Sequence, residues 1–154
     1  MKLNKYLKEL GYEQYDLPGY YDPALEKDEE LYSTAGADCR NEENEEGFCS
    51  YEFFNLADTL SLYIYSKLCY FRDYIAPICT PGSLISWNRD KLSEEERKIA
   101  TDEAHEKWIE IINKICEAFK MKITGCREGY EGIDNEKIRE GMQLFIEYYD
   151  CLWY

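Results

Sequence analysis

The sequence contains a single histidine, and its seven cysteines include no C-x-x-C pair. Zinc sites are built from closely spaced cysteines and histidines, so this class of site is disfavoured. The odd number of cysteines and their wide spacing favour reduced thiols over a disulfide framework. No apolar run approaches the roughly 20 residues that cross a bilayer, and residues 2–10 are too polar for a signal peptide. We therefore expect a cytoplasmic protein with no membrane partner, no metal and no cofactor.

Positive charge is also scarce, because 18 Lys and Arg stand against 32 Asp and Glu, for a net charge of −14. Such a charge repels a phosphate backbone, which disfavours direct nucleic-acid binding. The acids are concentrated in residues 11–50, where twelve of them are accompanied only by Lys27 and Arg40, a net charge of −10. The acidity therefore belongs mainly to one segment of the chain.

Apolar residues make up 45% of the 154 positions, which is enough for one sizeable core, so we expect a single helical domain over 1–154. Within it, residues 11–50 carry Pro18-Gly19, Asp22-Pro23 and scattered tyrosines, which predicts a long acidic, Tyr-rich loop segment. A loop of this length is uncommon in a compact domain and is usually functional or disordered. Residues 51–154 form the predicted helical core.

Helical periodicity first occurs in residues 2–10, which predict a short amphipathic helix that ends at Gly11. A longer helix is predicted from Ser50, which can cap it, to the region of Pro77, which prevents its continuation. The buried face expected for this second helix is the stripe Phe53, Ala57, Leu60, Ile64, Leu68, Phe71 and Ile75.

A third helix is predicted to begin at Ser93, because Ser at the N-cap and Glu96 three residues later form a capping-box pattern. We expect it to end at Gly125 and to bury Trp108, Ile111, Ile112, Ile115 and Phe119. A last helix, capped by Asp134, is expected to run almost to the final residue and to bury Ile138, Met142, Phe145, Tyr149 and Leu152.

No segment predicts a strand, so the expected fold class is all-α: a small three- to four-helix domain with a long acidic N-terminal loop region. Cys69 and Cys116 lie on the helical patterns among apolar neighbours, where we expect them to be buried as small hydrophobes.

Three stretches of the predicted core, Ile64–Phe71, Trp108–Phe119 and Gly141–Trp153, resemble the recurring blocks of a set of small, functionally unassigned helical proteins of tailed phages and prophages. The second stretch reads W-x-x-I-I-x-K-I-x-x-A-F and the third G-x-x-L-F-x-x-Y-x-x-x-L-W. The resemblance implies a helical fold and a viral protein that acts in the host cytoplasm. It implies no established activity.

One enzymatic alternative rests on paired carboxylates. Glu103-x-x-Glu106 and Glu131-x-x-Asp134 resemble the E-x-x-E and E-x-x-D pairs of all-α nucleotide pyrophosphohydrolases, in which such carboxylates hold Mg²⁺. Gly132 interrupts the second pair, and Asp134 has the position of a helix cap. Asp102-x-x-His105 is one half of a di-iron motif, but the chain has no second histidine. We therefore expect no catalytic residues and a protein that is not an enzyme.

The function predicted from the sequence is the binding, and inhibition, of a basic, nucleic-acid-handling host or defence protein by nucleic-acid mimicry. Tyrosines supply amphipathic contact area, and clustered carboxylates complement a basic groove. The expected binding surface is residues 12–46 with any neighbouring acids of the 93–110 helix, and its expected anchors are Tyr20, Tyr21 and Tyr32. The expected phosphate mimics are Glu29, Glu30, Glu42, Glu43, Glu45 and Glu46. Three alternatives remain open: the Mg²⁺-dependent nucleotide hydrolase described above, an acidic loop that only keeps the protein soluble, and a structural protein whose exposed aromatics form a homo-oligomer.

Overall fold

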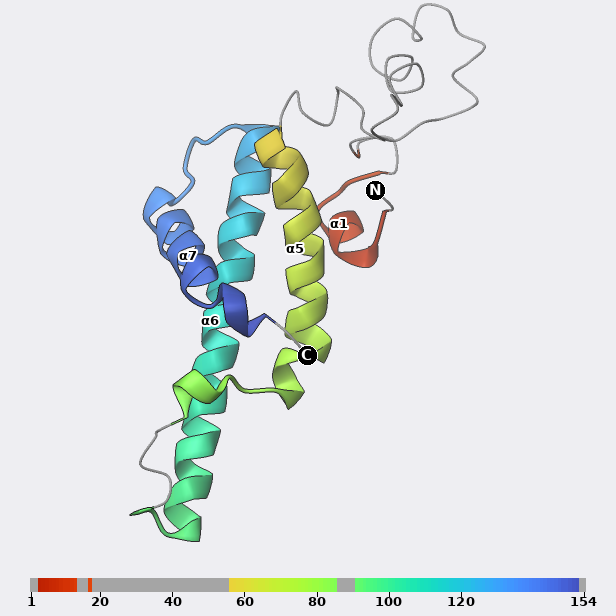
Figure 1. The fold of residues 1–154 in the computed structure, drawn as a ribbon. Helices are drawn as coiled ribbons and strands as arrows, with labels where there is room; N and C mark the ends of the chain where they lie inside the picture. The colour runs from red at the N-terminus through yellow and green to blue at the C-terminus, as the bar shows by residue number, and fades with distance from the viewer. Residues whose placement is uncertain (1–2, 14–16, 18–55, 86–90, 153–154) are drawn as a thin grey trace, which may run out of the picture. The chain divides into compact units, whose positions relative to one another are not determined.

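The computed structural model describes residues 3–13, 17, 56–85 and 91–152. Within these ranges the chain forms helices and no strand, so the prediction of a small all-α fold is confirmed (Figure 1). The chain divides into two compact units, Met1–Ser66 and Lys67–Tyr154. The single domain over 1–154 stays a prediction. The predicted acidic loop lies almost entirely outside the described residues.

In the first unit, helix α1 (Lys5–Glu9) begins where Asn4 caps it. The Asn4 side-chain oxygen accepts hydrogen bonds from the N–H groups of Tyr6 and Leu7 at 3.1 and 3.3 Å. Tyr6 and Leu7 are buried, as the amphipathic pattern predicts, and the chain leaves the helix at Gly11 with a φ of +77°. This left-handed conformation is one that glycine adopts without steric cost, so the predicted end of the helix is confirmed.

Helix α5 (Leu56–Tyr74) ends just before a 3₁₀ turn, η3 (Ala76–Ile78), with Pro77 in its first positions. The predicted end near Pro77 is thus confirmed, but the predicted buried face is largely wrong. Leu60 is 48% exposed, and of the described members of that stripe only Leu68 is buried. The face that is buried is instead Ser61, Leu62, Tyr65, Ser66, Leu68 and Cys69.

The two serines explain how a different face could become buried. Ser61 Oγ donates to the carbonyl oxygen of Ala57 at 2.6 Å, and Ser66 Oγ donates to that of Tyr63 at 3.0 Å. A buried hydroxyl whose hydrogen bond is made within its own helix costs little, so serine does not mark the solvent side here.

The second unit is organised around helix α6 (Glu94–Glu128), which has 35 residues. Its capping box is present as predicted: the N–H of Glu96 donates to Ser93 Oγ at 3.3 Å, and the N–H of Ser93 donates to Glu96 Oε2 at 2.8 Å. The predicted stripe is confirmed, because all of its members are buried: Trp108, Ile111, Ile112, Ile115 and Phe119. Cys116 is buried on the same side, and Cys69 is buried on α5, as expected for both.

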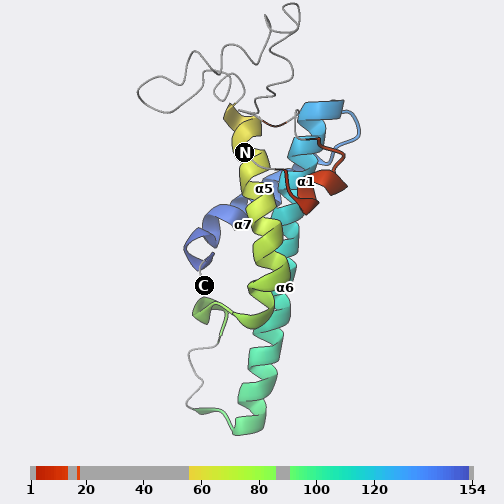
Figure 2. The same ribbon diagram turned by 90° about the vertical axis from the view of Figure 1, so that its right-hand side faces the viewer.

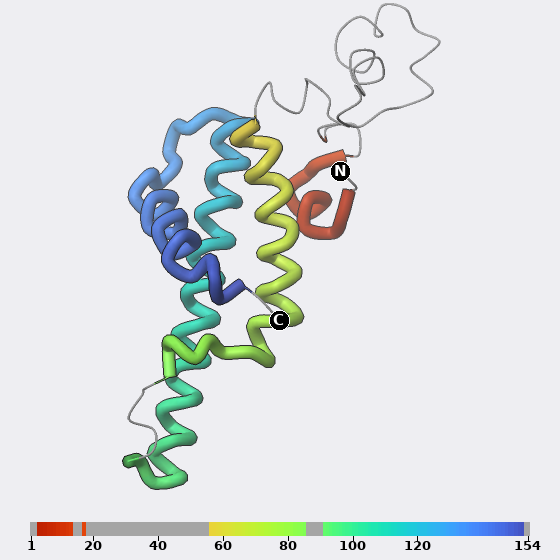
Figure 3. The backbone as a smooth tube through the Cα atoms, viewed as in Figure 1, coloured from red at the N-terminus to blue at the C-terminus, as the bar shows by residue number. Residues whose placement is uncertain are grey.

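Helices α6 and α7 (Asn135–Glu147) form a helical hairpin, whose path is clear in Figure 3. The predicted end of α6 at Gly125 is wrong, because the helix continues to Glu128 and ends at Gly129, where φ is +95°. Gly125 is a buried residue inside the helix, packed against the Tyr130 ring and Ile133. The two glycines have different roles: Gly129 adopts a positive φ, which favours glycine, whereas Gly125 has a helical backbone and packs closely against side chains.

Asp134 caps α7 as predicted, with its Oδ1 accepting from the N–H groups of Glu136 and Lys137 at 3.0 and 3.1 Å. The prediction that this helix runs almost to the last residue is wrong. Helix α7 ends at Glu147 and is followed by a 3₁₀ turn, η6 (Tyr149–Cys151). Tyr149, which was expected in the core, is 63% exposed, although its ring still contacts that of Phe145 edge-on at 5.7 Å.

Aromatic rings join the elements of this unit. The Trp108 ring on α6 lies 6.2 Å from Phe71, at the end of α5, and 5.9 Å from Tyr148, at the end of α7. Phe119 and Phe145 meet edge-on at 5.2 Å. Trp108 is fully buried, and its Nε1 has no hydrogen-bond partner among the residues that the structure describes. The core of this unit is therefore aromatic and centred on α6.

Candidate functional site

The outer side of α6 carries the main charged surface of the described residues. Residues 94–103 include no buried side chain, and the first buried position of the helix is Ala104. Figure 2 shows this N-terminal part of α6 continuing well past the end of α7. Five exposed carboxylates follow one another at helical spacing on the side opposite the buried stripe: Glu95, Asp102, Glu103, Glu106 and Glu110. We call these five residues the acidic face of α6.

The acidic face has a defined length and composition. At 1.5 Å per residue, Glu95 and Glu110 are separated by about 22 Å along the helix. Ile99, which is 55% exposed, lies between the carboxylates. Residues 94–110 also contain three bases: at 100° per residue Arg97 points away from the face, whereas Lys98 and Lys107 flank it, each about 40° from the nearest of its carboxylates. The face is thus an acidic stripe with one apolar side chain in it and a lysine along each edge.

Lys114 ends the acidic face on its C-terminal side. Its Nζ lies 3.0 Å from a carboxylate oxygen of Glu110 and 3.0 Å from one of Glu140 on α7. The hydrogen bonds to Glu140 and then to Glu110 raise the pKa of Lys114. Beyond it, α6 carries a surplus of bases, with Lys120, Lys122 and Arg127 against two acids. Negative charge therefore dominates only the first half of the helix.

The N-terminal end of the acidic face is held by the capping box. Hydrogen bonds from the side chain and then the backbone of Ser93 lower the pKa of Glu96. Glu96 is consequently committed to the cap, while Glu94 and Glu95 add negative charge to a helix N-terminus, where it is favourable. The capped first turn keeps the carboxylates of this helix end in one arrangement.

The predicted partner-binding residues are divided between the two parts of the chain. Tyr20, Tyr21 and Tyr32 lie outside the described residues. So do the predicted phosphate mimics, Glu29, Glu30, Glu42, Glu43, Glu45 and Glu46. The acids expected on the 93–110 helix are described, and they are exposed. Sequence reasoning did not identify Ile99 as part of this surface, although the apolar stripe that begins only at Trp108 was a signal that the first turns of α6 are solvated.

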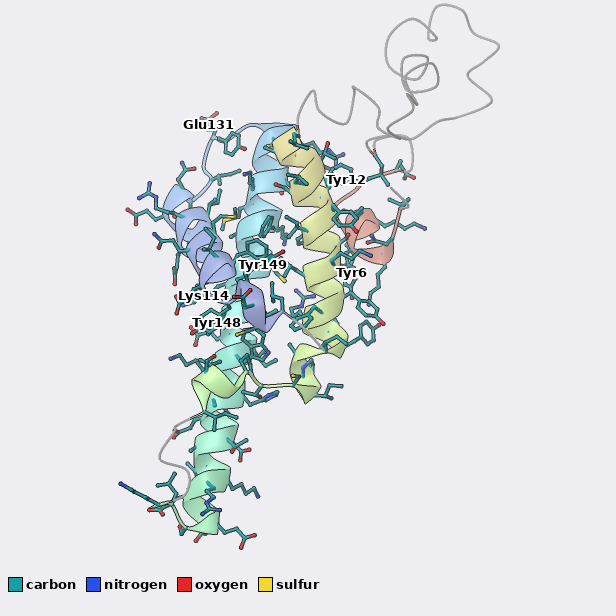
Figure 4. All side chains as sticks on the ribbon, viewed as in Figure 1. Tyr6, Tyr12, Lys114, Glu131, Tyr148 and Tyr149 are labelled. Atoms are coloured by element: carbon teal, nitrogen blue, oxygen red, sulfur yellow. The ribbon has the colours of Figure 1, made fainter. Side chains whose placement is uncertain are left out.

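The structure does not bring together the four carboxylates of the alternative metal site. Glu103 and Glu106 lie in the first half of α6, whereas Glu131 follows its last turn (Figure 4). From Glu106 to the end of α6 the helix alone spans about 33 Å, so the two pairs cannot hold one ion. Asp134 uses its carboxylate as the α7 cap. No group of three or more metal-ligating side chains occurs within the described ranges.

His105 has a structural contact instead of a metal partner. Its Nδ1 lies 2.9 Å from Thr80 Oγ1, in the segment that follows η3. This hydrogen bond ties the first half of α6 to residues 79–81. The Asp102-x-x-His105 pattern is therefore a piece of helix surface with one tertiary contact, and it forms no half of a di-iron centre with other described residues.

No family model, curated protein or solved structure matches this chain. The resemblance to small phage and prophage proteins accordingly stays a prediction. None of the helices in the described part of the chain is long and apolar enough to cross a membrane.

Proposed function

We propose that this chain is a phage-type acidic protein that binds a basic, nucleic-acid-handling protein of the host or of its defences and inhibits it. It does so by occupying the surface on which that protein holds nucleic acid, and it performs no catalysis. The observation that carries the proposal is the exposed acidic face of α6, which lies on a helix end that the core leaves in solvent.

The charge pattern of this chain is complementary to a basic groove. Residues 94–110 have a net charge of −4, and residues 11–50 add −10. Complementary potentials accelerate encounter and set the orientation of the partners, more than they add raw affinity. A capped helix also presents its carboxylates without a large ordering cost on binding. These properties fit a competitor of nucleic acid.

The contact area comes from side chains other than the carboxylates. Ile99 supplies an apolar contact within the acidic face. Tyr20, Tyr21 and Tyr32 are the proposed anchors, because tyrosine offers a large amphipathic surface and is enriched at interfaces. The glutamates predicted as phosphate mimics surround these tyrosines in the sequence. The proposal therefore combines the acidic face with residues 12–46.

The test uses four forms of the protein as bait in a bacterial lysate. The helix variant has the acidic face neutralised (Glu95→Gln, Asp102→Asn, Glu103→Gln, Glu106→Gln and Glu110→Gln). The segment variant has all twelve acids of residues 11–50 neutralised. The control variant loses the same charge as the helix variant from other exposed positions (Glu128→Gln, Glu131→Gln, Glu136→Gln, Glu147→Gln and Asp150→Asn). Bound proteins are identified and then challenged with salt and with duplex DNA.

We expect the native and control forms to retain the same nucleic-acid-binding protein, and to release it as salt rises or as DNA is added. The helix and segment variants should retain much less of it. Equal retention by all four forms would reduce the acidic surfaces to a role in solubility. A captured protein that DNA does not displace would refute mimicry.

A further inference from the structure

Two buried cysteines meet within the second unit, one from the last turns of α5 and one from the middle of α6. Cys69 is 0% exposed and Cys116 is 3% exposed, and both are present as thiols. A hydrogen bond joins their side chains, although the two residues lie far apart in the sequence. We call Cys69 and Cys116 the thiol pair.

The contact between two sulfur atoms distinguishes the thiol pair from the exposed or partly exposed cysteines with hydrogen bonds of their own. Cys126 Sγ lies 2.9 Å from the hydroxyl of Tyr130, and Cys151 Sγ lies 3.9 Å from that of Ser83. A buried cysteine that only fills space behaves as a small hydrophobe and needs no sulfur partner. Two thiols in direct contact on different helices have in addition the arrangement from which a disulfide forms.

The thiol pair lies next to a charged side chain that reaches solvent. The Arg72 guanidinium interacts electrostatically with both sulfur atoms, and the Arg72 side chain is 32% exposed. Its Nε donates to Asp73 Oδ1 at 2.8 Å, so an ion pair at the surface adjoins the buried thiols. A local opening of the last turns of α5 therefore exposes the pair without unfolding the rest of this unit.

Oxidation of the pair requires such an opening. The hydrogen bond with Cys69 and burial raise the pKa of Cys116, and the Arg72 charge acts in the opposite direction. The attacking species in disulfide exchange is the thiolate, so the closed structure protects both thiols. Once the segment opens, water reaches the thiols and the neighbouring positive charge favours the thiolate.

We propose that Cys69 and Cys116 are a redox-active pair, which a small disulfide of the glutathione class oxidises to a disulfide that joins α5 to α6. In the first step one protein thiolate attacks the reagent disulfide, which forms a mixed disulfide and releases one glutathione thiolate that takes up a proton. In the second step the other protein thiolate attacks the protein sulfur of the mixed disulfide and releases the second glutathione. The protein loses two electrons and two protons, and one oxidised glutathione becomes two reduced molecules.

Folding should favour this disulfide, because it brings the two sulfur atoms together before the bond forms. In the unfolded chain the bond closes a loop of about 50 residues, and the entropy lost corresponds to a factor of up to about 1,000 in the equilibrium constant. Strain in the bond reduces the gain, so we expect oxidation to be at least about tenfold more favourable in the folded protein. No residue of the acidic face or of residues 12–46 takes part, so the thiol pair is independent of the proposed inhibition.

The test equilibrates the full chain with mixtures of reduced and oxidised glutathione, with and without a denaturing concentration of urea. Acid stops the exchange, and the remaining thiols are alkylated in denaturant. Mass spectrometry of the peptides then measures the fraction of protein that carries a Cys69–Cys116 disulfide. The ratio of the oxidation equilibrium constants with and without urea is the measured quantity, and far-UV circular dichroism confirms that the protein without urea is folded.

Two variants accompany the native protein. Cys116→Ala removes one member of the pair, whereas Cys126→Ala, the matched control, removes an exposed thiol from the same helix. The oxidised native protein and the oxidised Cys126→Ala variant should unfold at a higher urea concentration than their reduced forms, and Cys116→Ala should show no such shift. A ratio below tenfold would overturn the proposal. So would a shift that persists in Cys116→Ala, or oxidation that joins Cys69 or Cys116 to another cysteine.

Discussion

Gly141 is the position at which α7 lies directly against the backbone of α6. A Cβ atom added there would overlap the Cβ of Ala118 and would lie 2.7 Å from the carbonyl oxygen of Lys114. Neither atom can move away, because one is a methyl group fixed to its helix and the other is helix backbone. Gly141→Ala therefore has to push the two helices apart.

The expected size of the effect is the difference between two terms. Replacing glycine by alanine inside a helix stabilises it by about 0.5–1 kcal/mol. Overpacking a rigid contact costs about 1–3 kcal/mol, and the upper half of that range applies when neither contact atom can yield. Gly141→Ala should consequently lower the free energy of unfolding by about 1–2 kcal/mol.

Urea unfolding followed by far-UV circular dichroism measures this difference, and Gly125→Ala is the matched control. A Cβ at Gly125 would lie 2.5 Å from a carbon of the Tyr130 ring, but that ring is 49% exposed and can turn outward. The free energy of unfolding of Gly125→Ala should thus stay within about 0.5 kcal/mol of the native value. If Gly141→Ala proved as stable as the native protein, the close packing of α6 on α7 would be refuted.

Three further predictions concern stability and reactivity. The Ser93 hydrogen bonds lower the pKa of Glu96 in the folded state. The ionised Glu96 carboxylate therefore stabilises the fold fully above the unfolded-state pKa of about 4.3, and this stabilisation is lost as pH falls through the lower folded-state pKa. Glu96→Gln should remove this part of the acid dependence in urea unfolding measured at several pH values, and an unchanged pH profile would argue against the capping box. A hydrogen bond with the Cys69 thiol and burial raise the pKa of Cys116. An alkylating reagent should therefore modify exposed Cys126 well before Cys116, which mass spectrometry of the labelled protein measures. Trp108→Phe should stay within about 1 kcal/mol of the native free energy of unfolding, because it removes a buried N–H that lacks a partner among the described residues. Trp108→Ala should instead cost about 3–5 kcal/mol in the same assay.

The features predicted correctly from the sequence depend on short-range chemistry. Ser93 and Asp134 cap their helices because the accepting side-chain oxygen and the donating backbone N–H lie within three residues of each other. The buried stripe of α6 was predictable because its other faces are strongly charged, which leaves a single apolar side. The exposed acids of the same helix were predictable for the same reason.

The buried face was predicted incorrectly for α5, where apolar residues occupy more than one side. Leu60 and Tyr63 face solvent while Leu62, Tyr65 and two serines are buried, and periodicity alone does not rank these two faces. The order of residues in a helix defines which side chains share a face. Only the neighbouring elements determine which face is covered.

The sequence by itself determined the helical fold, the caps and the location of negative charge, because each depends on residues close together in the chain. The tertiary structure decided that α6 continues through Gly125, since that glycine packs against the Tyr130 ring, and that α6 ends at Gly129. It also separated Glu106 from Glu131 by about 33 Å of helix, so the two carboxylate pairs of the alternative metal site do not come together. Burial and convergence of side chains are properties of pairs of elements, and no single segment encodes them.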